Sequence, residues 1–559
     1  MLKITRYLFN GLKEIFFICR IWSPKIDRNL NSSISNFSKV NSSYWKKDIL
    51  NIKTDTSQRK INILIEGHLS DYGPNYLFRT ALAAKAIEDS VKNVSIEIIV
   101  NGFSHQWTAA KIAYASFNIT NWIYLGGRYF FIEPLIIILA VLKASFEFFR
   151  LKDTKSIISL VVGGIKLGDL VYDQVLRSTK KGTIENLNLD LLLVMIRSYH
   201  YYYLYSIFFW NKNYQYYIAT HTAYPEYGIL ARIALKNRVK VIESNDVQMT
   251  LFDESTENFL PTYHDGIRAK IISEKRTTKK TNEEIIKSAK AKLEKRFNNK
   301  LDQIDAKKSF TGKVYSRDSL LEKINLTPKK SLGFIFAHVF VDSPHLSRSM
   351  LYLDYYRWLK ETIKICALSS ETNWIVKPHP AVDVYSEKGE IEKLVKKFGK
   401  ENIVICPEDF NTKSIINCAD IITTVHGTVG LEFSCMGIPV VLAGTPFYSN
   451  FGFTIEPKSI EEYGEILKTA HNINKLSDSE ILSAQYIFDL WEEIFDWNNL
   501  IYTYDVLANV WGHGVKRDLN KAYTILTENL ANTDPRQIKL WHFVKAISDQ
   551  KISNILDKS

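Results

Sequence analysis

Short apolar runs alternate with amphipathic stretches along most of the chain. From residue 61 the runs Ile61–Ile65 and Val94–Val100 enclose a helical pattern, and Tyr216–Ala219 and Val239–Ile242 follow further on. Short β-rich runs separated by helical patterns are typical of parallel strands joined by crossover helices. The pattern therefore predicts an α/β domain over residues 60–269.

The same alternation begins again over residues 331–458. Four helical patterns separate the β-rich runs there, which are Leu332–Phe336, Trp374–Lys377, Ile403–Ile405, Ile421–Thr423 and Pro439–Leu442. Two such series predict two Rossmann-like, doubly wound domains that face each other across a cleft, the arrangement called GT-B. Ligands of such sheets bind at the carboxyl ends of the strands, so the chemistry is expected just after the strands.

Three further segments complete the predicted organisation. We expect a basic amphipathic extension at 1–59, a Lys-rich, exposed helical connector at 270–330 and a helical region at 459–559. The apolar stretches 129–142 and 199–210 are too short to span a bilayer, and buried helices are the favoured interpretation. A membrane-dipping surface would give much the same pattern.

The charge of the chain is concentrated in two places. The 559 residues include 72 Lys+Arg and 60 Asp+Glu, a formal net charge of +12. Residues 1–60 hold 12 basic and 4 acidic residues, and residues 270–313 hold 14 and 6, so these two segments exceed the whole surplus. The remainder is slightly acidic, which disfavours a broad nucleic-acid groove. We expect no nucleic-acid partner.

The first basic segment has the composition of a membrane-surface helix. In residues 2–22, Lys3, Arg6, Lys13 and Arg20 interrupt apolar residues that recur at helical spacing. Such a helix can lie on an anionic membrane, although it could equally pack on its own protein. The five cysteines are scattered without a CxxC pair, which fits a reducing compartment. We expect a cytoplasmic protein, peripheral on the inner face of the cytoplasmic membrane.

The tetrapeptide Lys377-Pro378-His379-Pro380 directly follows a predicted strand. Its prolines restrict the backbone and hold the imidazole of His379 rigidly. His379 could donate a hydrogen bond to a phosphate oxygen, and Lys377 adds a positive charge. A purely structural turn is the alternative.

A second motif, His426-Gly427-Thr428, opens a predicted helix after another strand. Gly427 would let a ligand approach the backbone, and Thr428 could cap a helix whose free N–H groups bind an anion. A plain helix cap is the alternative. Glu432 lies one turn further on, where its carboxylate could accept ribose hydroxyls.

Further polar residues follow other predicted strands. Asp342 lies between His338 and His345, which makes it a candidate general base or nucleophile. In the first domain, Glu66 is a second catalytic candidate, and His221 and Tyr224 are further cleft candidates at comparable strand ends. Satisfied loop residues are the alternative in each case.

Taken together, these motifs resemble those of the bacterial capsule and surface-polysaccharide biosynthesis glycosyltransferases, a group that includes Kdo transferases. The resemblance is carried by KPHP, by HGTVGLE and by the segments 164–173, 221–232, 338–345 and 354–358. It implies a GT-B fold with the donor bound mainly by the C-terminal half, where His379-Pro380 matches the HP motif and Thr428 matches the hydroxyl that holds the donor phosphate. The nucleotide motifs are similar to those of bacterial sialyltransferases that use CMP-sugars.

The sequence therefore predicts a glycosyltransferase that moves a sugar from a nucleotide-sugar donor, CMP-linked donors included, to a surface polysaccharide or lipid-linked acceptor. Asp342, Glu66 and His379 are the catalytic candidates; the donor site comprises Lys377, His379, Pro380, His426, Gly427, Thr428 and Glu432. No DxD motif stands out near a strand end, so neither a metal nor another cofactor is expected. The alternatives are a polymer phosphotransferase with a CDP-glycerol donor, a sugar-nucleotide epimerase and a non-catalytic scaffold of envelope assembly.

Overall fold

The structure, a computed structural model, describes residues 30–45, 60–91, 93–245, 248–277, 279–300, 304–345, 347, 349–494, 503–512 and 516–548. The predicted basic helix over residues 2–22 lies outside them. The chain divides into two compact units. Unit 1 consists of Met1–Val175, Asn186–Pro261 and Asp496–Ser559, and unit 2 consists of Leu176–Glu185 and Thr262–Phe495.

Unit 1 is built on a six-stranded sheet with the order β3-β2-β1-β6-β7-β8. Its strands are β1 (Ile61–Glu66), β2 (Val94–Val100), β3 (Asn121–Tyr124), β6 (Tyr216–Ala219), β7 (Lys240–Asn245) and β8 (Gln248–Phe252). All neighbouring pairs are parallel except β7 and β8, which are antiparallel. Taken in chain order, the parallel strands are arranged 3-2-1-4-5, the order of a Rossmann sheet.

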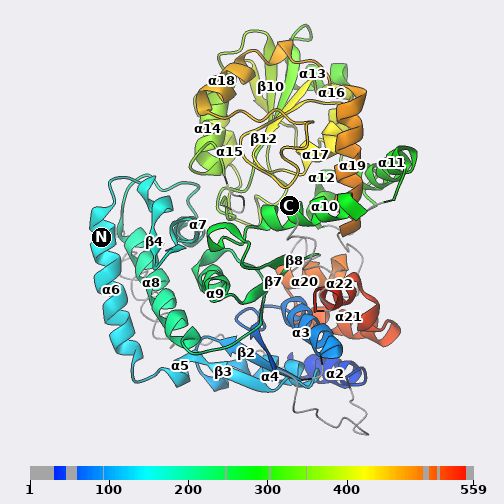
Figure 1. The fold of residues 1–559 in the computed structure, drawn as a ribbon. Helices are drawn as coiled ribbons and strands as arrows, with labels where there is room; N and C mark the ends of the chain where they lie inside the picture. Colours follow the sequence, from blue (N-terminus) through cyan, green and yellow to red (C-terminus); the bar gives the residue numbers. More distant parts are fainter. Residues whose placement is uncertain are drawn as a thin grey trace. The chain divides into compact units, whose positions relative to one another are not determined.

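Helices form several layers around this sheet (Figure 1). They are α2 (Leu30–Ser42), α3 (Pro74–Ser90), α4 (Thr108–Ala115), α5 (Leu125–Arg128), α6 (Glu133–Arg150), α7 (Gly168–Thr179, which crosses into unit 2), α8 (Leu189–Phe209), α9 (Tyr224–Lys236), α20 (Tyr504–Trp511), α21 (Leu519–Asn532) and α22 (Lys539–Ser548). Near the C-terminus, α21 packs on α2 and α22 packs on α3. The predicted region 459–559 is therefore divided between the two units.

Unit 2 contains a five-stranded, all-parallel sheet with the order β11-β10-β9-β12-β13. The strands are β9 (Ser331–Phe336), β10 (Thr372–Lys377), β11 (Ile403–Ile405), β12 (Ile421–Thr424) and β13 (Val440–Leu442). This order is again 3-2-1-4-5. The predicted α/β class, with two Rossmann-like, doubly wound units and added helices, is confirmed; that the units face each other across a cleft stays a prediction.

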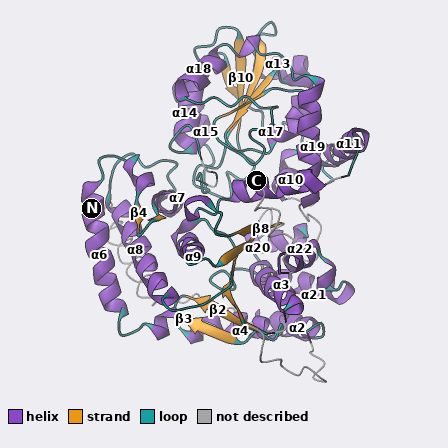
Figure 2. Cartoon of the chain, in the orientation of Figure 1, coloured by secondary structure: helices purple, strands orange, loops and turns teal. Residues whose placement is uncertain are grey.

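The helices of unit 2 cover both faces of its sheet, as Figure 2 shows around the orange strands. They are α10 (Tyr263–Thr277), α11 (Asn282–Phe297), α12 (Ile304–Ser309), α13 (Arg317–Ile324), α14 (Tyr355–Cys366), α15 (Glu390–Phe398), α16 (Ile415–Cys418), α17 (Val429–Ser434), α18 (Ile460–Lys468) and α19 (Asp478–Ile494). The crossover connections explain the two layers. The chain moves from β9 outwards to β10 and β11 on one side, and then returns past β9 to β12 and β13 on the other side. Right-handed crossovers that run in opposite directions place their helices on opposite faces of the sheet.

The two apolar stretches of unit 1 have different environments. Over residues 199–210 the prediction of a buried helix is confirmed for most of the stretch, since α8 is buried along most of its length, although Trp210 after it is exposed. Over residues 129–142 the prediction is wrong for one face of α6, because only Ile136, Ala140 and Ala144 of that helix are buried. The physical reason is that α6 packs on α8 and not on the sheet.

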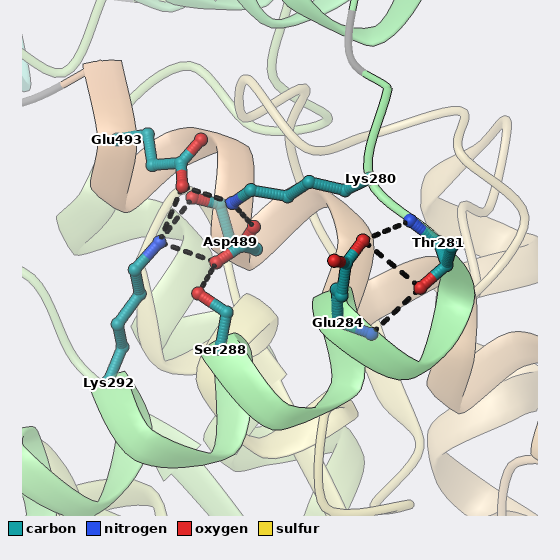
Figure 3. Close-up of polar contacts among 7 residues, drawn as sticks. All are labelled: Lys280, Thr281, Glu284, Ser288, Lys292, Asp489 and Glu493. Carbon is teal, nitrogen blue, oxygen red and sulfur yellow. Dashed lines mark hydrogen bonds and ion pairs between the residues drawn. The ribbon is translucent and has the colours of Figure 1, made fainter.

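The Lys-rich segment is not an exposed excursion, since α11 packs along α19. A capping box between Thr281 and Glu284 begins α11. Lys280, Lys292 and Ser288 converge on the carboxylate of Asp489 in α19 (Figure 3). Their hydrogen bonds to it measure 2.7, 2.5 and 2.5 Å. Burial alone would raise the pKa of Asp489, but these hydrogen bonds outweigh it and hold the pKa below its ordinary value.

We predict that Asp489→Asn lowers the free energy of unfolding by about 2 kcal/mol at neutral pH, because two lysines lose a charged hydrogen-bond acceptor. The stabilisation is present above the unfolded pKa of Asp, about 4, and is lost as the pH falls through the lower folded value. Urea unfolding at several pH values measures this. Glu493→Gln is the control, since its side chain is 43% exposed and its pairing should contribute under about 1 kcal/mol. Equal losses in both variants would contradict the prediction.

Candidate functional site

Each sheet has a switch point, where the strand order reverses and the crossovers leave towards opposite faces. In unit 1 it lies between β1 and β6, and in unit 2 between β9 and β12. Open α/β sheets bind ligands at this point, beyond the carboxyl ends of the strands. In both units a side chain at or just after the end of the central strand bridges the switch point.

In unit 2 the bridging side chain is His338, which follows β9. Its Nε2 lies 3.1 Å from Thr424 Oγ1 and accepts the backbone N–H groups of Val425 and His426 at 3.3 and 3.2 Å. Since Nε2 is an acceptor, the proton of the neutral ring is on Nδ1. Burial, together with the nearby His379 and His264, lowers the pKa of His338 to about 3.

The ring of His426 lies inside the protein. Its Nε2 is 2.5 Å from Ser347 Oγ, and its Nδ1 is 3.0 Å from the hydroxyl of Tyr355. Burial lowers the pKa of His426 well below its ordinary value. A Cβ at Gly444 would lie 2.5 Å from Nε2, so only glycine fits there without a shift. The structure thus gives this predicted donor-site side chain a set of internal hydrogen bonds.

A third histidine of this cluster, which was not predicted from the sequence, is His264 of α10. Its Nδ1 accepts the backbone N–H of Phe447 at 3.3 Å, and its ring centroid is 5.0 Å from that of His426. Burial lowers the pKa of His264 to about 4. No local motif marks this residue, because the chain brings it to the site from a helix that precedes the sheet.

The KPHP and HGT segments reach the same edge of the sheet from β10 and β12, with β9 between them. His379 Nδ1 accepts the backbone N–H of Ala381 at 3.2 Å, which leaves the proton of the neutral ring on Nε2. His379 and Pro380 are half-buried. Burial lowers the pKa of Lys377, whose amine lies near enough to Cys406 for the two groups to interact electrostatically.

In HGTVGLE, neither the hydroxyl of Thr428 nor the carboxylate of Glu432 has the role predicted for it. Thr428 precedes α17, but its side chain makes no cap hydrogen bond, so the prediction of a hydroxyl cap is wrong. Its side chain is half-exposed. Glu432 is buried, and its carboxylate lies 2.9 Å from the guanidinium of Arg296 in α11. That carboxylate is committed to a buried ion pair and does not lie open to a ribose. The carbonyl of Gly427 accepts the Tyr448 hydroxyl at 2.5 Å.

Asp342 lies in the loop after β9, with a side chain that is 42% exposed. Its carboxylate is 3.5 Å from Arg177 and accepts the hydroxyl of Tyr385 at 2.8 Å. Beside it, Glu387 accepts the backbone N–H groups of Phe340 and Val341 at 2.8 and 2.9 Å. Burial, together with the charge of Asp342, raises the pKa of Glu387 to about 7, although the two backbone hydrogen bonds oppose the rise. Sequence reasoning missed Glu387.

The last predicted histidine of unit 2, His345, lies near enough to His426 for its charge to lower the pKa of His426. The structure therefore gathers four predicted histidines, His338, His345, His379 and His426, at one edge of the unit 2 sheet.

In unit 1 the switch point is bridged by Glu66, which ends β1. Its buried carboxylate accepts the hydroxyl of Thr220 after β6 and lies 3.0 Å from His68 Nδ1. Burial would raise the pKa of Glu66, but His68 and Thr220 hold it below its ordinary value. Burial would likewise lower the pKa of His68, but Glu66 raises it. An imidazole oriented by a carboxylate can take up and release a proton, so the pair has acid–base capacity.

The other two candidates of unit 1 lie beside this pair. The charge of His221 lowers the pKa of Glu66, and its ring centroid is 4.4 Å from that of Tyr227. Tyr224, the buried first residue of α9, has a φ of +63°, an uncommon conformation for a residue with a side chain. Glu66, His221 and Tyr224 thus belong to unit 1, whereas the other candidates belong to unit 2.

Among the described residues, no helix is long and apolar enough to cross a membrane. No group of three or more His, Cys, Asp or Glu side chains among them is placed to hold a metal ion.

Residues 364–487 match the model of a protein family described as "Capsule polysaccharide biosynthesis protein". This segment contains both the KPHP and the HGT motifs, and the predicted resemblance to that class of protein is confirmed over it. No curated protein sequence matches the chain.

Several solved structures are similar at low identity. A Thermosulfurimonas dismutans KpsC, a β-Kdo 2,4 transferase, is 18% identical over 45% of this chain and 73% of its own, with a TM-score of 0.28. A putative UDP-N-acetylglucosamine 2-epimerase from Listeria monocytogenes is 10% identical over 77% and 91%, with a TM-score of 0.25. A glycosyltransferase from Rickettsia africae is 11% identical over 90% and 100%, with a TM-score of 0.25. These scores are too low to define a shared arrangement of whole chains.

We predict that His264→Asn reduces the loss of stability on acidification. The folded pKa of His264 lies below the unfolded one, so the unfolded chain binds the extra proton, and stability present above about pH 6.5 is lost as the pH falls towards the folded value. A buried histidine whose folded pKa is lowered in this way adds a slope of about 1.4 kcal/mol per pH unit to the free energy of unfolding as a function of pH. The variant should lose the contribution of His264. Urea unfolding between about pH 7 and pH 5 measures the slope. The exposed His471, changed to Asn, is the control; identical slopes in all three proteins would contradict the prediction.

Proposed function

We propose that the chain is a glycosyltransferase that moves a sugar from a nucleotide-sugar donor to a surface polysaccharide or lipid-linked acceptor. One observation carries the proposal: both donor motifs lie within the segment that matches the capsule polysaccharide family, and they flank β9 at the switch point of unit 2. A switch point is where an open α/β sheet binds a nucleotide.

The donor's leaving phosphate is stabilised by a few placed groups. His379 presents Nε2–H because its Nδ1 is used by the backbone of Ala381. The Thr428 hydroxyl is not used as a helix cap and supplies a second donor. Lys377 contributes a positive charge. Hydrogen-bond donors fixed where negative charge develops lower the barrier to breaking the sugar–phosphate bond. The proposal requires neither a metal nor another cofactor.

The acceptor hydroxyl must lose a proton during transfer, and two carboxylates are candidates for that step. Asp342 is half-exposed beside Arg177 and Tyr385, while Glu66 is buried and orients His68. In the second case Glu66 is the positioning residue, and His68 takes the proton. Comparing Asp342→Asn with Glu66→Gln in a transfer assay separates them.

We predict that His379→Asn lowers donor turnover by about a hundredfold, the usual effect of removing one donor to a developing anion. Asparagine can still accept the backbone N–H of Ala381, so the loop is kept while the Nε2–H group is lost. His379→Gln, whose amide N–H reaches further, should recover part of the rate. His471→Ala is the control. Turnover of CMP-linked sugars with a glycan or lipid-linked acceptor is measured, and full activity of His379→Asn would contradict the phosphate role.

We further predict that a cytidine nucleotide raises the melting temperature more than UDP or GDP does. Ligand at about a hundred times its Kd stabilises the folded protein by about 2.7 kcal/mol. Thr428→Val should reduce the shift, whereas Thr469→Val, at an exposed residue after α18, should not. A shift with CMP selects a CMP-sugar donor; a shift with CDP and turnover of CDP-glycerol selects the phosphotransferase. Conversion of a nucleotide sugar without acceptor selects an epimerase, and no shift with any nucleotide selects a scaffold.

A further inference from the structure

Helix α6 is held in one orientation on unit 1. Its buried residues Ile136, Ala140 and Ala144 are spaced one turn apart and face α8, the helix on which α6 packs. The small alanines allow close approach of the two helices. At the start of α6, Glu133 lies 3.2 Å from His200 of α8. Figure 1 shows α6 alongside α8 at the edge of the unit.

The opposite face of α6 is apolar and exposed. Its apolar stripe consists of Phe131, Leu135, Leu139, Leu142, Phe146 and Phe149, which recur at helical spacing. The exposed fractions of Phe131 and Phe149, near its two ends, are 90% and 81%, and that of Leu135 is 68%. Scattered apolar residues are normal on a protein surface, but a contiguous patch marks a binding surface for a protein or a membrane.

Basic side chains border one end of the stripe. Lys143 and Arg150 lie over the ring of Phe146, 5.3 and 5.4 Å from its centroid. Exposed Lys152 and Lys155 follow α6. Residues 128–166 contain six basic and three acidic residues. Of the acidic residues, Glu133 is paired with His200, and Glu147 is paired with Lys143 and Arg150. Side chains with an apolar stem and a cationic head at the edge of an apolar surface suit the headgroup layer of an anionic membrane.

We propose that the apolar stripe of α6 is a membrane-docking surface whose partner is an anionic lipid bilayer. The helix lies in the plane of the interface, with the stripe at the boundary between headgroups and acyl chains. Lipid suits this surface better than protein, because no side chain from Pro134 to Leu142 can make a hydrogen bond, whereas protein interfaces carry about one per 100–200 Å². This surface does not depend on the transfer reaction.

The test is co-sedimentation of the full chain with vesicles of phosphatidylcholine and phosphatidylglycerol, without donor or acceptor. The variant Leu135→Gln/Leu139→Gln/Leu142→Gln should bind at least about tenfold less tightly, since three leucines no longer enter the acyl boundary. Arg150→Gln/Lys152→Gln should weaken binding by about fivefold per residue, and vesicles of phosphatidylcholine alone should bind the unchanged protein weakly. The matched control is Leu368→Gln/Val384→Gln, which removes exposed apolar side chains of unit 2.

A second stripe variant, Phe131→Ser/Phe149→Ser, keeps the test decisive if the leucine variant does not fold. Unchanged vesicle binding by a folded stripe variant would overturn the proposal. So would a dimer of the unchanged chain, seen by light scattering, that ignores vesicles and is lost in the stripe variants, because a second copy would then be the partner. A marked fall in melting temperature of both variants without vesicles would also overturn it, since residues outside the described part would then cover the stripe.

Discussion

The structure of the unit 2 edge depends on one hydrogen-bond acceptor, the Nε2 atom of His338. At the switch point, β9 and β12 run side by side while the segments after them diverge, so the backbone N–H groups of Val425 and His426 have no partner in a neighbouring strand. Buried N–H groups without an acceptor are costly. A neutral imidazole supplies the acceptor. The ring must stay unprotonated to do so, and its burial against Tyr355, stacked at 4.4 Å, keeps it so.

Unit 1 meets the same constraint with a carboxylate in place of an imidazole. Glu66 accepts the Thr220 hydroxyl across its switch point and is held ionised by His68. The two edges therefore differ in charge: the bridge of unit 2 is a neutral imidazole, and that of unit 1 is a buried carboxylate beside an imidazole. A neutral edge does not repel a phosphate, and it leaves Lys377 and His379 to attract one. A fixed carboxylate disfavours phosphate, which is consistent with the proposal that the donor phosphate binds to unit 2.

Most of the strands could be predicted closely from the sequence, because each is a short β-rich run. The outer strands β3 and β8 of unit 1 were not predicted. Ile403–Ile405 was predicted with the bounds that the structure has.

His379 could be identified because prolines on both sides fix its backbone. The role of Glu432 could not be predicted, because helical spacing shows on which face of a helix a residue lies but not which residue it contacts. Its partner, Arg296, comes from another helix. His264 carried no signal at all, because its environment is made by residues distant in the chain. The exposed face of α6 was misjudged because apolar residues on both faces of a helix give no period that distinguishes core from surface.

The net charge was similarly ambiguous, because a count of lysines gives equal weight to those that face solvent and those that are paired. In the segment from 270 to 313, Lys280 and Lys292 are bound to the Asp489 carboxylate of α19. Arg296 is buried against Glu432. These cations hold α11 onto α19 and onto the sheet helix α17, and they are not available to an external anion. The segment's surplus is therefore partly a means of internal attachment. On α6, Lys143 and Arg150 are likewise paired with Glu147 of the same helix. Lys152 and Lys155, which follow α6 beside the exposed apolar surface, are exposed and can act on a partner outside the chain.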